Sequence, residues 1–251
     1  MTITEFDTIT DRAAWATADR VRHHAVAVGR PHHTDDGLVV AWLADRGMFI
    51  NAAVVLSPPE SWDDVIARIA GVVPAGVPAT LVSPYDTPDL SARGWALVGH
   101  PPLMARLPGA ATAPPVPPEL RIHEVVDDAG LEVFERTIVD GYPMPDLQPY
   151  EWGHLYDERV LGGATRLWVG FVDGEPVATS AVHVAAGVNN VEMIATLEGA
   201  RGHGYGAAVT WAATTADPSV PAVLIASDLG RPVYERLGYT ALTRWTMWYR
   251  P

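Results

Sequence analysis

Three glycines within five positions, directly after an apolar run, constrain the fold of this chain more than any other feature. The run covers residues 191–196, and the glycines are Gly202, Gly204 and Gly206. Glycine leaves backbone N–H groups uncovered, and a helix that begins there directs those donors and the positive end of its dipole at one point. The sequence therefore predicts a strand, an anion-binding loop and a helix, in this order.

The spacing of these glycines shows which known phosphate-loop motif this chain matches. A Walker A loop needs Gly-Lys-Ser/Thr, but Gly206 is followed by Ala207, which argues against a nucleotide triphosphatase. The dinucleotide fingerprint needs Gly-x-Gly-x-x-Gly, and the last gap here is too short. The pattern that fits is Arg/Gln-x-x-Gly-x-Gly/Ala. It resembles the coenzyme A pyrophosphate loop of the GNAT superfamily, the acyl-CoA-dependent N-acetyltransferases.

A second motif about 30 residues downstream strengthens this resemblance. The apolar residues 222–226 are followed by Val233-Tyr234 and then by Leu237-Gly238-Tyr239. This order is similar to the family's strand, short tyrosine-bearing helix and closing hairpin. The resemblance implies acetyl-CoA, or another acyl-CoA, as the cofactor.

Composition limits the function classes. The chain has 251 residues, no cysteine and a formal net charge of −13. The lack of cysteine excludes a disulfide-stapled secreted protein, and the charge argues against a nucleic-acid partner. No stretch approaches the 18 to 20 apolar residues of a membrane span, and no signal peptide is visible. We expect a cytoplasmic protein, monomer or homodimer, that acts on a small-molecule or peptide amine and has no membrane partner.

A proline-rich segment predicts a division of the chain. Residues 109–118 contain four prolines among small residues and are expected to form an extended linker. Residues 119–251 would be the catalytic GNAT domain. Residues 1–108 would be a degenerate GNAT-like copy. The expected fold class is α+β, with a mixed, mostly antiparallel sheet and helices on both faces, in two tandem copies.

In the second half, the predicted elements follow the GNAT order. They are a strand at 120–125, a helix through Leu131, Phe134 and Ile138, a loop at 141–146, a second helix at 151–161, a hairpin of 167–172 and 177–184 around Asp173-Gly174, the strand at 191–196 and the motifs above.

We expect the first half to follow the same plan, displaced by 144 residues, which is the distance from Gly94 to Gly238. That shift moves the 191–196 strand to residues 47–52, which overlap an apolar strand candidate at residues 48–54, and the phosphate loop to residues 57–62. Pro58 and Pro59 lack N–H donors, and Glu60 would repel an anion. We therefore expect one cofactor per chain. An unrelated α/β domain with a chance Gly-aromatic ending is the alternative.

The resemblance assigns cofactor contacts to both motifs. Arg201 would contact phosphate or brace the loop, His203 would act through its backbone, and Ser227 stands where many relatives carry asparagine. The full set is Met193, Ile194, Ala195, Thr196, Arg201, Gly202, His203, Gly204, Tyr205, Gly206 and Ser227.

The resemblance also suggests catalytic residues. Tyr234 takes the position of the family's general acid, or else is a core tyrosine. Glu192 is the candidate general base, or else a solvent-facing residue at a strand start. His183 is the second candidate for the base, since its intrinsic pKa suits the role, although a lone histidine on a strand is often structural.

The acceptor pocket is predicted from Tyr142, Met144, Tyr150 and Trp152. The histidine pairs at residues 23–24 and 32–33 lack ligand spacing, so no metal site is expected. The function predicted is acyl transfer, most simply from acetyl-CoA to an amine by direct attack. The alternative is a non-catalytic acyl-CoA-binding or regulatory module.

Overall fold

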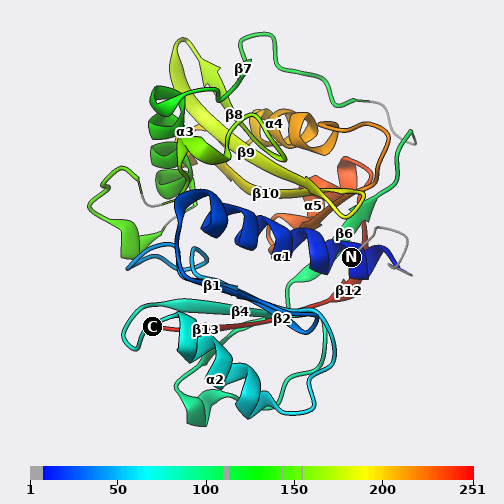
Figure 1. The fold of residues 1–251 in the computed structure, drawn as a ribbon. Coiled ribbons are helices and arrows are strands. Elements are labelled where there is room, and N and C mark those ends of the chain that lie inside the picture. Colours follow the sequence, from blue (N-terminus) through cyan, green and yellow to red (C-terminus); the bar gives the residue numbers. More distant parts are fainter. Residues whose placement is uncertain (1–7, 110–112, 143, 154) are drawn as a thin grey trace.

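Two mixed sheets make up the protein, and helix α1 (Ile9–Val28) lies between them (Figure 1). The computed structural model describes residues 8–109, 113–142, 144–153 and 155–251. Helix α1 contacts β2 and β3 of the first sheet and β9 and β10 of the second. Its buried positions include five alanines spread around the helix, as expected for a helix covered on both sides.

The first sheet has the order β1-β2-β3-β4-β13-β5. Its strands are β1 (His32–Thr34), β2 (Leu38–Ala41), β3 (Ala52–Val55), β4 (Ala79–Ser83), β5 (Ala96–Gly99) and β13 (Thr246–Arg250). Only β3 and β4 run parallel, and α2 (Trp62–Val72) connects them. Val65 and Ile69 of α2 are buried in a core that includes Leu81 and Trp95. This sheet therefore has α1 on one face and α2 on the other.

The second sheet has the order β12-β6-β11-β10-β9-β8-β7. Its strands are β6 (Pro102–Arg106), β7 (Arg121–Glu124), β8 (Thr165–Val172), β9 (Glu175–Ala185), β10 (Val188–Thr196), β11 (Ala222–Ile225) and β12 (Thr240–Arg244). Strands β10 and β11 are the parallel pair, connected by α4 (Tyr205–Thr214). The remaining helices are α3 (Asp128–Gly141) and α5 (Arg231–Arg236). Both sheets thus repeat one plan around a parallel pair of strands.

The two halves of the chain exchange a strand. Strand β6 precedes the proline-rich segment, yet it pairs with β11 and β12; Met104 lies opposite Leu224 and Ala241. Strand β13 comes from the end of the chain and pairs with β4 and β5, with Trp248 opposite Leu81 and Leu97. The division at residues 109–118 separates two halves of the chain, but the sheets do not follow it.

Most predicted elements of the second half are present. Helix α3 carries Leu131, Phe134 and Ile138 on its buried side, and the Asp127 side chain caps it by accepting the Gly130 N–H. The β8–β9 hairpin turns at Asp173 and Gly174, which both have positive φ. The predicted helix and hairpin are therefore confirmed. Both have strong local signals, a capping side chain for the helix and an Asp-Gly pair for the turn.

Three expectations were wrong. The helix predicted at 151–161 is replaced, in its described part, by a short 3₁₀ helix at Glu158–Val160, because Gly153 takes φ +93° and the Asp157 side chain starts a new turn. The closing hairpin does not form, because β12 and β13 part at Trp245 and enter different sheets. The strand expected at 48–54 begins only at Ala52.

No helix among the described residues is both long and apolar enough to cross a membrane.

Candidate functional site

The parallel strands β10 and β11 separate soon after they meet. They pair only at Asn189 with Ala222 and at Asn190 with Val223, and β10 then continues to Thr196. A bulge interrupts the β9–β10 ladder between Glu192 and Ala195, where Met193 has φ +50°. From residue 191 onward, β10 has no strand partner on its β11 side among the described residues. Met193, Ile194, Ala195 and Thr196 all lie on this stretch. The carbonyl oxygens of Met193 and Thr196 accept hydrogen bonds from the Thr179 and Arg201 side chains, so the backbone groups that can pair with a ligand are the others on the β11 side.

The glycine loop opens α4 without a side-chain cap. Gly202 and Gly204 have φ of +83° and +84°, and α4 begins at Tyr205 with no side chain bonded to its first N–H groups. A Cβ at Gly202 would meet no atom within 4 Å, and one at Gly204 would meet only Pro117, at 3.7 Å. The loop therefore faces open space with uncovered donors at the positive end of the helix dipole, which suits a pyrophosphate.

Packing against β10 fixes the position of this loop. A Cβ on Gly206 would lie 2.7 Å from Thr196 Oγ1, so a larger residue there would force the loop or the Thr196 side chain to shift. The Arg201 side chain donates to the carbonyl oxygens of Thr196 and Gly141, each at 3.1 Å. Arg201 thus braces the loop against β10 and α3, the second of its two expected roles. The His203 ring stacks on Tyr205, with ring centres 5.4 Å apart.

Tyr234 lies on α5 with an uncommitted hydroxyl. The residue is 9% exposed, and its hydroxyl forms no hydrogen bond with the described residues. Burial, with a smaller contribution from Tyr142, raises the pKa of Tyr234 to about 12, so the phenol keeps its proton at neutral pH. Ser227 Oγ accepts the Gly230 N–H at 3.0 Å and holds the turn before α5. That turn places the tyrosine beyond the end of β11.

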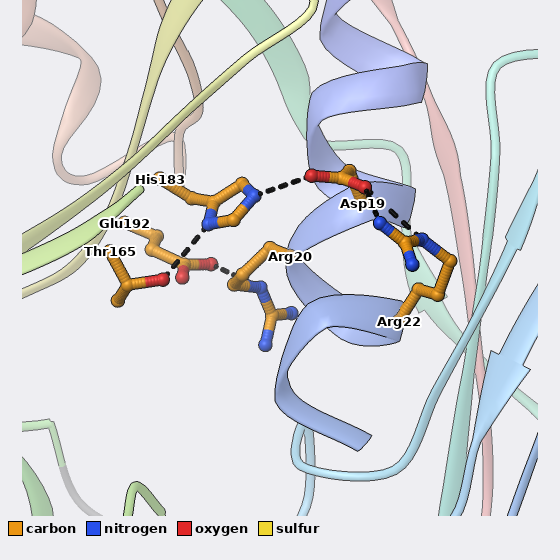
Figure 2. A network of polar contacts seen from close by, with 6 residues as sticks. All are labelled: Asp19, Arg20, Arg22, Thr165, His183 and Glu192. Carbon is orange, nitrogen blue, oxygen red and sulfur yellow. Dashed lines mark hydrogen bonds and ion pairs between the residues drawn. The ribbon is translucent and has the colours of Figure 1, made fainter. Parts of the chain in front are cut away.

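Glu192 is not a free solvent-facing carboxylate. Its Oε1 accepts a hydrogen bond from the Tyr156 hydroxyl at 3.0 Å, and its Oε2 lies 2.9 Å from Nε of Arg20 on α1. Its side chain is 17% exposed. The first half of the chain therefore reaches the second half's candidate site through an ion pair, shown in Figure 2.

His183 is sealed inside the interface between α1 and β9. The residue is fully buried; Nε2 lies 3.0 Å from Asp19 Oδ2, and Nδ1 lies 2.9 Å from Thr165 Oγ1 (Figure 2). The hydrogen bond with His183 holds the pKa of Asp19 at about 2. Thr165, His183 and Asp19 are ordered like a nucleophilic triad, but Thr165 is only 2% exposed. These contacts make His183 a structural link rather than a base that substrate can reach.

The four predicted acceptor residues lie in different surroundings in the structure. Tyr142 is exposed and lies edge-on to Phe49, with ring centres 6.3 Å apart. Met144 is buried in the hydrophobic core that includes α1. Tyr150 lies under Arg136 on the outer surface of α3. Trp152 is half exposed and lines a cavity.

This cavity, of about 580 Å³, lies between the end of α1 and residues 152–153 and 155–159. His24 and Tyr156 line it, and their rings stack with centres 5.5 Å apart. The pKa of His24 is lowered to about 4, mainly by burial and secondly by the positive charge of Arg20. Sequence reasoning missed Arg20, His24 and Tyr156, since no local pattern shows that α1 docks on β10.

The matching region of the first half is closed. Ser61 caps α2 by accepting the Asp64 N–H, and Asp63 and Asp64 occupy the first turn. Strands β3 and β4 stay paired over three consecutive positions, from Ala52 to Val54. Neither an uncapped helix start nor separated strands are present there.

Comparisons with solved structures agree with this arrangement. The sequence matches no family model and no curated protein. It is similar to a GCN5-related N-acetyltransferase from Kribbella flavida, with a TM-score of 0.71 at 24% identity over 98% of this chain and 97% of that one. A putative GNAT-family acetyltransferase from Novosphingobium aromaticivorans gives a TM-score of 0.63 at 15% identity, over 97% of this chain and 98% of that one. A GCN5-related N-acetyltransferase from Sphaerobacter thermophilus gives 0.53 at 13% identity, over 87% and 82%. The chain therefore has the GNAT fold, built from two mixed, mostly antiparallel sheets.

Proposed function

We propose that the protein transfers an acyl group, acetyl in the simplest case, from acyl-CoA directly to an amine. One observation carries this proposal. The separated stretch of β10 leads into an uncapped, glycine-lined helix start, and Tyr234 follows β11, the strand from which β10 parts. The first half of the chain has the same plan but lacks these features, so they are not a by-product of the fold.

The residues fit the parts of acyl-CoA. The N–H groups of residues 202–206 would hold the pyrophosphate, and the unpaired edge of residues 193–196 would hydrogen-bond the pantetheine arm. When bound, acyl-CoA supplies an acyl group activated as a thioester.

The chain's own groups would handle the protons. Glu192 takes a proton from the ammonium of the acceptor, directly or through water. The backbone N–H groups near Met193 stabilise the carbonyl oxygen while the N–C bond forms. Tyr234 gives its proton to the sulfur that leaves when the C–S bond breaks. Burial keeps the pKa of Tyr234 at about 12, so the hydroxyl is protonated before the step.

The second candidate function, a non-catalytic acyl-CoA-binding module, has an observation in its favour. Both candidate bases already have protein partners: Glu192 is paired with Arg20 and Tyr156, and His183 is sealed between Asp19 and Thr165. A protein that only binds acyl-CoA would need neither base to be available.

Calorimetric titration of acetyl-CoA and a thiol-release assay separate the two functions. Wild type should bind one acetyl-CoA per chain, and Gly204→Glu should not, because it places a carboxylate at an anion site and a side chain at φ +84°. A broad amine panel should then raise thiol release above the hydrolysis background. Binding without amine-dependent release would favour the binding module, and no binding at all would overturn both functions.

A further inference from the structure

The guanidinium of Arg20 has more hydrogen-bond donors than its protein partners use. Its side chain is only 9% exposed. Nε faces the Glu192 carboxylate at 2.9 Å, but the N–H is not aligned with it and makes no hydrogen bond. The two terminal nitrogens have no hydrogen bond from the described parts of the chain. Unlike Nε, these two nitrogens are accessible to solvent.

Solvent reaches these terminal nitrogens, and a ligand that displaces it must supply acceptors for their N–H groups. A buried charge needs partners, and the terminal N–H groups of arginine form a planar fork that matches a carboxylate. Figure 2 shows these terminal nitrogens turned away from Glu192. The donors are therefore directed at a position next to the candidate base rather than at the base itself.

The neighbouring Glu192 limits the charge that a ligand can carry. A carboxylate has about four acceptor positions. Tyr156 takes one and Arg20 lies against another, so positions remain for an ammonium group. A purely anionic ligand such as a phosphate would be repelled by Glu192. The Arg20 guanidinium and the Glu192 carboxylate are in contact at 2.9 Å. A ligand that carries a positive and a negative group close together therefore satisfies both side chains.

We propose that the acceptor is a free amino acid, with its carboxylate on the terminal nitrogens of Arg20 and its amine beside Glu192. This inference rests on the proposed acyltransferase function and names its substrate class. In the reaction, the ammonium loses a proton to Glu192, and the nitrogen bonds to the acyl carbon as the C–S bond breaks. The thiolate takes the Tyr234 proton, and the nitrogen gives up its second proton as the amide forms, which restores the Tyr234 hydroxyl through solvent. Arg20 belongs to the first half of the chain, so that half would supply substrate specificity to a site in the second.

The test compares each L-amino acid with its carboxamide, which keeps the amine and the side chain but removes the negative charge. With acetyl-CoA, at least one amino acid should show kcat/KM about tenfold to a hundredfold above its amide, the range expected for a charge-assisted pair of hydrogen bonds. Arg20→Met should remove this preference and lower the value for the acid far more than for the amide. Arg20→Lys should fall between, because lysine keeps the charge but not the fork.

Arg22→Met is the matched control, since Arg22 lies on the same helix and pairs with Asp19 rather than Glu192. It should keep the preference for the acid. Acetyl-CoA titration of each variant checks that it is folded. If Arg20→Met does not bind acetyl-CoA, the acid-to-amide preference of Arg20→Lys is the deciding measurement. Equal rates for acids and amides in wild type would overturn the proposal. An equal loss on both in Arg20→Met would also overturn it and leave Arg20 as a positioning residue for Glu192.

Failure of the proposed function has a different result. If no amine is acetylated, the amino acids are titrated by calorimetry against the complex with acetyl-CoA, and against the free protein if none forms. Binding of an amino acid to wild type but not to Arg20→Met would then support the Arg20 site alone. No binding would overturn it.

Discussion

At the residue scale, Tyr234 separates binding from chemistry most clearly. Tyr234→Phe removes only a hydroxyl that has no hydrogen bond with the described residues, so folding and acetyl-CoA affinity should change little. Turnover should fall about tenfold or more, because the leaving thiolate loses its proton donor. Steady-state kinetics with a calorimetric Kd for acetyl-CoA measure both effects. Unchanged turnover would remove Tyr234 from the mechanism and leave it as a core tyrosine.

Gly206 offers a second test at the same scale, with its own rescue. Gly206→Ala places a Cβ 2.7 Å from Thr196 Oγ1, so the loop must move away from β10. Acetyl-CoA affinity should fall about tenfold or more, since the N–H donors lose their alignment. In the double variant with Thr196→Ala, the nearest remaining atom is Thr196 Cβ at 3.9 Å, and affinity should largely return. If the double variant binds no better than Gly206→Ala, the contact is not what requires glycine there.

At the element scale, the interface between α1 and the second sheet depends on Asp19. The hydrogen bond with His183 lowers the pKa of Asp19 from 3.8 to about 2. Because the folded-state value lies below the unfolded one, the stabilisation is present above about pH 4 and is lost as pH falls toward 2. Asp19 is one-third exposed, so we discount the shift and expect about 1 to 2 kcal/mol at neutral pH.

Urea unfolding of wild type and Asp19→Asn at several values between pH 3 and 7 tests this link. The difference in unfolding free energy should be largest near neutral pH and should narrow below about pH 4. Asp45→Asn is the control, because Asp45 is exposed and lacks a partner in the described structure. A difference that stays constant down to pH 3 would show that the charge of Asp19 does not hold α1 in place.

The same scale shows what sequence reasoning could reach. Elements with a local signal were predictable: the helix through Leu131, Phe134 and Ile138, the Asp173-Gly174 turn and the glycine loop. The docking of α1 on β10 was not, because Arg20 and Glu192 are 172 positions apart and neither lies in a motif that names the other. The partners of Glu192 could therefore be found only from the structure, whereas Tyr234 and the glycine loop could be found from the sequence.

At the scale of the whole molecule, the exchange of β6 and β13 makes the two halves interdependent. Without β6, a gap would open between β11 and β12, and without β13 between β4 and β5. Both strands are central: Leu103 and Met104 are at most 1% exposed, and Trp248 is 5% exposed. Arg106 adds a side-chain bond to the Leu237 carbonyl. The domain boundary at 109–118 stays a prediction, and each sheet contains one strand from the other side of it.

Cleavage in the linker tests this interdependence. A protease site inserted within residues 109–118 should yield two fragments that elute together at the size of the intact protein, because each sheet holds a strand of the other fragment. After separation in urea, neither fragment should regain a cooperative unfolding transition alone, since each sheet then exposes unpaired backbone on both sides of a missing strand. Mixing the fragments should restore the transition and acetyl-CoA binding. A fragment of residues 119–251 that folds and binds acetyl-CoA alone would show that the second half needs neither β6 nor α1.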